Sequence, residues 1–113
     1  MPAERPNRYE LMPGTLDMLV LKILDSGPLH GYGIAQQLLQ RTDEALKAEE
    51  GSLYPALQRM RQKGWIRAEW RQTPNNQRAR YYTVTAAGRR QLGVAMSRFG
   101  DLVAIIGSVL GTA

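Results

Sequence analysis

The chain has 113 residues, an ordinary apolar content and a formal net charge of +5, which is typical of one small domain with a polyanionic partner. It has no cysteine and a single histidine, His30, which excludes disulfides and cysteine chemistry and leaves too few ligands for a transition-metal site. We therefore expect no metal and no cofactor. We also expect no enzyme, because no cluster of titratable groups or phosphate-loop glycine pattern is evident.

Residues 1–10 contain two prolines and mixed charges, a pattern that predicts a flexible N-terminal arm. The arm lacks the apolar segment of a signal peptide. The apolar run at 16–24 is too short and too charged to span a bilayer. We therefore expect a cytoplasmic protein with no membrane partner.

Two helices are predicted next. The run from Gly14 is apolar at 16, 19, 20, 23 and 24, as in a helix with one buried stripe, and it ends at the turn residues 26–28. HGYGIAQQLLQR at 30–41 gives the second helix, with Ile34 and Leu38 facing inward. His30 is expected to cap this helix or pack at its start.

The segment EEGSLYPALQRMRQKGW at 49–65 predicts a third helix with Ser52 as its N-cap, which would place Pro55 in the first turn. Its apolar residues gather on one side at helical spacing. The opposite side offers hydroxyl, amide and guanidinium donors and no carboxylate. These are the groups that contact bases and phosphates, although an ordinary solvated helix face has the same appearance. The outward residues are Ser52, Pro55, Gln58, Arg59 and Gln62, with Tyr54 and Arg61 on the flanks.

Two strands joined by an asparagine-rich turn are predicted between residues 66 and 84. Ile66, Ala68 and Trp70 alternate with charged residues, and RARYYTVT resumes the strand pattern after QTPNNQ. The result is a β-hairpin with basic outward residues. The region from Arg59 to Arg90 is strongly basic and contains one acid, Glu69.

The last predicted helix begins after Thr85, the expected N-cap. Apolar residues then recur at alternating steps of four and three, which is a heptad seam that favours dimerisation. The seam consists of Leu92, Met96, Phe99, Val103, Ile106 and Leu110. Gly93, Gly100 and Gly107 recur beside it, for close helix approach or as a source of low stability before assembly.

Three helices, a hairpin and a long helix, in that order, predict a mainly α fold: a winged helix-turn-helix with a C-terminal dimerisation helix. The expected boundaries are an arm at 1–10, the DNA-binding domain at 11–85 and the dimerisation helix at 86–113. In this architecture the third helix enters the major groove and the hairpin, or wing, follows the DNA backbone. Arg71, Arg78 and Arg80 would meet phosphates there.

The motifs HGYGI at 30–34, EGSLYPALQRM at 50–60, GWI at 64–66 and RARYYTVTAAGRRQL at 78–92 resemble the PadR family of bacterial transcriptional regulators. The resemblance covers residues from about Leu11 to Leu92 in the family's order. It implies a homodimeric repressor that binds double-stranded DNA. We expect a near-palindromic operator, because a dimer would place two recognition helices in successive major grooves. The family's DNA-contacting positions would fall on Ser52, Tyr54, Pro55, Gln58 and Arg59.

The resemblance also implies a possible small aromatic or drug-like effector. The only candidate residues for its pocket are aromatics that a small core would use equally well: Trp65, Trp70, Tyr81, Tyr82 and Phe99. Two other functions stay open at this point. One is a winged helix that binds protein, and the other is a nucleic-acid binder without sequence preference.

Overall fold

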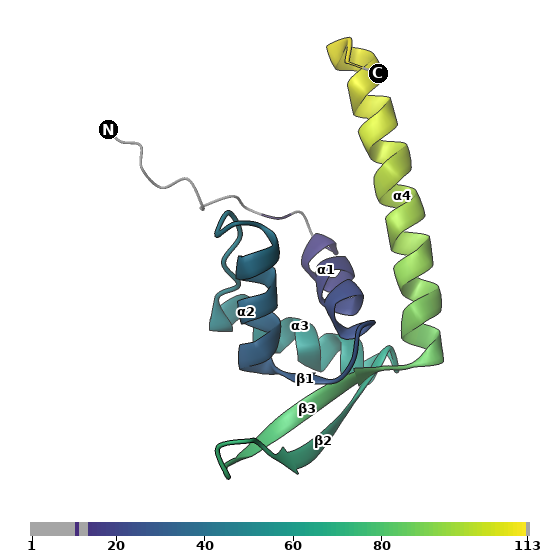
Figure 1. The fold of residues 1–113 in the computed structure, drawn as a ribbon. Helices are drawn as coiled ribbons and strands as arrows, with labels where there is room; N and C mark the ends of the chain where they lie inside the picture. Colours follow the sequence, from purple (N-terminus) through teal and green to yellow (C-terminus); the bar gives the residue numbers. More distant parts are fainter. Residues whose placement is uncertain (1–10, 12–13, 113) are drawn as a thin grey trace, which may run out of the picture.

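The computed structural model describes residue 11 and residues 14–112 (Figure 1). The elements in chain order are α1 (Thr15–Leu24), β1 (Leu29–His30), α2 (Gly31–Arg41), α3 (Glu50–Gln62), β2 (Ile66–Gln72), β3 (Arg78–Val84) and α4 (Ala86–Leu110). Helices α1 to α3 cluster on one side of the small sheet, and α4 extends away from it beside α1 (Figure 1). The predicted fold class is confirmed. The predicted arm at 1–10 lies outside the described residues.

The core lies between α1, α2, α3 and the start of the hairpin. The inward faces expected from helical spacing are buried, because these are the positions where apolar side chains from neighbouring helices meet. The core contains Met18, Val20, Leu21, Leu24, Ile34, Leu53, Ala56, Leu57, Met60, Ile66, Tyr82, Val84 and Leu92. Leu38 is buried as well.

The sheet has three antiparallel strands in the order β1-β3-β2. The hairpin register pairs Ile66 with Val84 at its base and Gln72 with Arg78 at its tip. The sequence analysis missed β1, which pairs Leu29 with Tyr82. Two residues are too few to show an alternating pattern, and they adjoin a turn and a helix start.

Both predicted caps next to the hairpin are present. The Nδ1 atom of His30 accepts a hydrogen bond from the Gly33 amide at 2.9 Å. The Thr85 hydroxyl accepts one from the Gly88 amide at 3.0 Å. Each cap satisfies a backbone donor that the first turn of a helix leaves without a partner.

The expected start of α3 is wrong. The helix begins at Glu50 after Glu49, rather than after Ser52. Pro55 is therefore not in the first turn, and the Gly51 carbonyl receives no hydrogen bond from it because proline has no N–H. The amides of Ser52 and Leu53 both donate to the Glu49 carbonyl. These backbone bonds form the first turn, which has no side-chain cap.

Candidate nucleic-acid interface

The outward face of α3 is accessible and free of carboxylates, as its sequence predicts. Ser52, Pro55, Gln58, Arg59 and Gln62 are all exposed, while the opposite face of the helix is buried in the core. The core therefore fixes the orientation of α3 and holds its amide, hydroxyl and guanidinium groups towards solvent.

Arg59 is not an isolated cation on this face. One of its Nη2 hydrogens is donated to Oδ1 of Asp17 on α1 at 2.7 Å. The Asp17 side chain is only 12% exposed, whereas that of Arg59 is 48% exposed. The carboxylate therefore lies beneath the guanidinium and leaves the other donors of Arg59 accessible. The sequence analysis did not identify Asp17, because its partner is 42 residues away.

Tyr54 lies on the flank of α3 that faces the hairpin, and it packs closely against the start of α2. A Cβ atom on Gly31 would come within 2.6 Å of the Tyr54 hydroxyl. Only glycine leaves enough space for the ring at this position. Gly31 therefore allows the first turns of α2 and α3 to approach each other.

The three wing arginines do not share a face of the hairpin. Directly paired residues of an antiparallel ladder lie on the same face. Arg80 is paired with Trp70 and Arg78 with Gln72 on one face, and Arg71 lies on the other. The three arginines predicted to meet DNA phosphates are therefore divided between the two faces of the hairpin. Arg78 and Arg80 lie on the face that carries the core residues near the hairpin base.

The two faces also differ in their ion pairs. Arg71 donates to Glu69 at 2.7 Å, and its guanidinium lies 5.4 Å from the ring centre of Tyr81. The guanidinium of Arg78 lies 5.3 Å from the ring centre of Trp70 and has no carboxylate partner among the described residues. Among the described hairpin arginines without a carboxylate partner, Arg78 and Arg80 thus lie on one face and Arg67 lies on the other.

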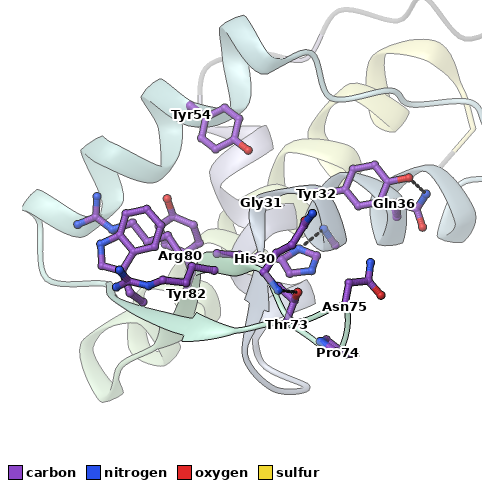
Figure 2. A pocket seen from close by; sticks show the side chains of 15 residues that line it. His30, Gly31, Tyr32, Gln36, Tyr54, Thr73, Pro74, Asn75, Arg80 and Tyr82 are labelled. Carbon is purple, nitrogen blue, oxygen red and sulfur yellow. Dashed lines mark hydrogen bonds between the residues drawn. The ribbon is translucent and has the colours of Figure 1, made fainter.

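A cavity of about 790 Å³ opens between α2, α3 and this face of the hairpin. Figure 2 shows Tyr54 of α3 at its top, Tyr32 and Gln36 of α2 on one side, and Arg80 and Tyr82 of β3 on the other. Burial raises the pKa of the Tyr82 hydroxyl above its ordinary value, an effect that the nearby Arg80 opposes. Tyr82 is therefore neutral at physiological pH.

The distal part of α4 presents a large apolar surface to solvent. Of the predicted seam, Leu92 is buried in the core of its own chain, whereas Met96, Phe99, Val103, Ile106 and Leu110 are all exposed. Exposed apolar surface of this extent marks an interaction site. Among the described helices, α4 alone is long and apolar enough to cross a membrane, by length and composition only. The mean hydropathy of an 18-residue window of this helix is 1.5, and 11% of that window is buried within the protein.

Two of the glycines beside the seam, Gly93 and Gly100, have no packing role within a single chain. A Cβ atom at Gly93 or Gly100 would meet nothing within 4 Å. Any close approach that these two glycines allow must therefore involve another molecule.

The aromatic residues considered for an effector pocket do not gather in one place. Trp70 and Tyr82 line the large cavity, and Phe99 lines a separate groove against α1. Tyr81 makes an edge-on contact with His30 on the opposite face of the sheet. Among the described residues, no group of three or more histidines, cysteines, aspartates or glutamates could hold a metal ion.

Comparisons with known proteins agree with this geometry. The model of the family described as Transcriptional regulator PadR-like family matches residues 20–94. A PadR family transcriptional regulator from Eggerthella lenta has 31% identity and a TM-score of 0.75, over 88% of this chain and 85% of that chain. A PadR family transcription regulator from Clostridium difficile has 28% identity and a TM-score of 0.74, over 86% of this chain and 99% of that chain. An uncharacterized protein from Lysinibacillus sphaericus is 26% identical over 99 residues, 88% of this chain and 91% of the relative.

Proposed function

Because the chain belongs to the PadR-like family of transcriptional regulators, we propose that it is a sequence-specific DNA-binding protein that acts as a homodimeric repressor. The observation that carries this proposal is the outward face of α3, which exposes Ser52, Gln58, Arg59 and Gln62 without a carboxylate. Such donors match base edges and phosphates in the major groove.

In this proposal α3 enters the major groove and the wing follows the neighbouring backbone. Arg59 discriminates between bases, with the carboxylate of Asp17 behind it, while Ser52, Tyr54, Pro55, Gln58 and Gln62 complete the contact surface. Arg78 and Arg80 bind phosphates. Arg71 has a lesser role, because Glu69 neutralises it on the opposite face of the hairpin.

The dimer forms through the exposed seam of α4. Met96, Phe99, Val103, Ile106 and Leu110 would leave water on pairing with a second copy. Arg98 and Asp101 lie in the middle of the helix, where charges are costly in a bilayer, and this favours a protein partner over a lipid one. Leu92 is left out because it already belongs to the core.

Two recognition helices related by a twofold axis would lie in successive major grooves, roughly 34 Å apart. The operator would then be a near-palindrome, and repression would follow from blocked polymerase access in the cytoplasm. A small aromatic effector is implied by the resemblance alone.

A pair of variants tests the division of roles within this interface. The probe is the DNA duplex that the wild-type protein enriches most from a random-sequence pool, here called the selected duplex, with a scrambled duplex as control. Arg59→Ala should reduce the preference for the selected duplex by about 5- to 150-fold, since a bidentate base contact contributes about 1–3 kcal/mol of discrimination.

The second variant, Arg78→Ala combined with Arg80→Ala, should weaken binding to both duplexes equally and reduce the salt dependence. Fluorescence anisotropy at several salt concentrations measures both effects. Identical behaviour of the two variants would disprove the proposed division between base contacts and phosphate contacts.

A further inference from the structure

The cavity between α2, α3 and the hairpin contains hydrogen-bond donors from three different elements. The Tyr32 hydroxyl accepts a hydrogen bond from Nε2 of Gln36 at 2.8 Å, so its own hydrogen remains available to another acceptor. Tyr32 is also 67% exposed. An exposed tyrosine whose oxygen is already oriented by a neighbour is well suited to donate to an incoming ligand.

Arg78 and Arg80 supply the positive charge of this cavity, and Arg80 is the more deeply placed of the two. Its Nε atom is buried and has no hydrogen-bond partner, although such groups are nearly always satisfied in folded proteins. Because this Nε atom is covered by protein, Arg80 offers the cavity the positive charge of its guanidinium rather than this particular donor (Figure 2).

Among the residues that the structure describes, no carboxylate lines the cavity. The nearest acid on the hairpin, Glu69, lies on the other face with Arg71. The lining therefore combines cationic and neutral donors, which is the composition of a site for an anion.

Position and size indicate which anion. Tyr54 lines the cavity and also flanks the outward face of α3, so the cavity adjoins the surface proposed to contact bases. Its volume of about 790 Å³ is large for a single phosphate, and its ring faces, from Trp70 and Tyr54, suit the apolar sides of deoxyribose. A small molecule of drug size would also fit by volume alone, but it would not account for the continuity with α3.

We propose that this cavity binds the sugar–phosphate backbone of DNA beside the groove that α3 enters, with Tyr32, Tyr54 and Arg80 donating to phosphate oxygens. The inference rests on the proposed function and extends it to α2, which the sequence analysis assigned only to the fold. Tyr32 contacts the DNA backbone, and Gln36 orients the Tyr32 hydroxyl.

The test compares substitutions that remove donors without removing the walls. Tyr32→Phe keeps the ring and should weaken binding to the selected and scrambled duplexes alike, by roughly 3- to 10-fold. Arg80→Gln should weaken both by at least as much and make the slope of log K against log salt shallower by about 1. Arg67→Gln is the matched control, because it removes the same charge from the opposite face of the hairpin at an exposed arginine outside the proposed interface. It should leave both the affinity and the slope nearly unchanged.

Amide NMR spectra then distinguish the source of the phosphate. Titration with the scrambled duplex should shift the signals of Tyr32 and Gly33, whereas millimolar inorganic phosphate at constant ionic strength should not. Shifts of equal size with inorganic phosphate would overturn the assignment to DNA backbone in favour of a free anion.

The proposed role of the cavity would be disproved, and the proposed function kept, by one result: the wild type prefers its selected duplex, and Tyr32→Phe and Arg80→Gln keep the wild-type affinity and salt slope. A wild-type protein that binds no duplex would instead overturn the proposed function itself. If the cavity binds a small molecule and does not contact DNA, the two variants should keep the wild-type affinity and salt slope.

Discussion

The ion pair between Asp17 and Arg59 gives a quantitative prediction for both stability and DNA binding. Asp17→Asn removes the negative charge beneath the guanidinium but keeps the size of the side chain and one acceptor oxygen. A hydrogen bond to a charged group contributes about 1.5–3 kcal/mol. Arg59 is 48% exposed, so solvent lowers the net value towards about 1 kcal/mol. We therefore expect the melting temperature to fall by roughly 4 °C.

Asp17→Asn should lower the preference for the selected duplex and raise the affinity for the scrambled duplex. Without the Asp17 carboxylate, the Arg59 side chain gains rotamers that reach phosphates. It is also no longer held in one conformation before it binds DNA. Preference for the selected duplex should fall about tenfold, equivalent to about 1.4 kcal/mol. Affinity for the scrambled duplex should rise, and its salt dependence should steepen by about 0.9 for one additional phosphate contact.

Thermal unfolding followed by circular dichroism and anisotropy titrations at several salt concentrations measure these quantities. The control is Asp25→Asn, which makes the same change in net charge at the C-cap of α1 but frees Arg89, away from the proposed interface. It should leave preference and slope unchanged. If Asp17→Asn lowers stability but keeps wild-type preference and slope, the ion pair serves only the fold and the reasoning is refuted.

Three further substitutions test other parts of the structure. Phe99→Asp places a charge in the proposed seam and should give monomers by sedimentation; an unchanged dimer would place the interface elsewhere. Gly88→Ala puts a methyl group against the backbone oxygen of Trp65 and should lower the free energy of unfolding by up to about 3 kcal/mol, measured in urea, whereas Gly51→Ala, where a Cβ meets nothing within 4 Å, should not. The raised pKa of Tyr82 means that the unfolded chain loses this proton first, so stability should fall as the pH rises above about 10; Tyr82→Phe should reduce that fall, and an unchanged pH dependence would exclude Tyr82 as its cause.

The sequence predicted well the features that depend on periodicity. The buried stripe of α3 and the hydroxyl cap of Thr85 follow from spacing along a single element, and both are present. The start of α3 could not be placed the same way. Ser52 is a favoured cap, but the helix begins three residues earlier than predicted, because the Ser52 amide donates to the Glu49 carbonyl.

Features that depend on pairing between distant residues were not accessible from the sequence. The separation of Arg71 from Arg78 and Arg80 requires the hairpin register, since a shift of one residue would exchange the two faces. The Asp17–Arg59 pair and the cavity beside Tyr32 depend on how α1, α2 and the hairpin pack around α3. A glycine on each side of Tyr32 was the one local sign that two elements approach closely there.

The most direct test of the account is selection of DNA by the wild-type protein from a random-sequence pool, followed by anisotropy on the selected and scrambled duplexes. The account predicts enriched sequences with two half-sites whose centres are about 10 base pairs apart. It also predicts binding to the selected duplex that is about a thousandfold tighter than to the scrambled one. Equal affinity for both, with no sequence enriched, would contradict the claim that this protein recognises a specific DNA sequence.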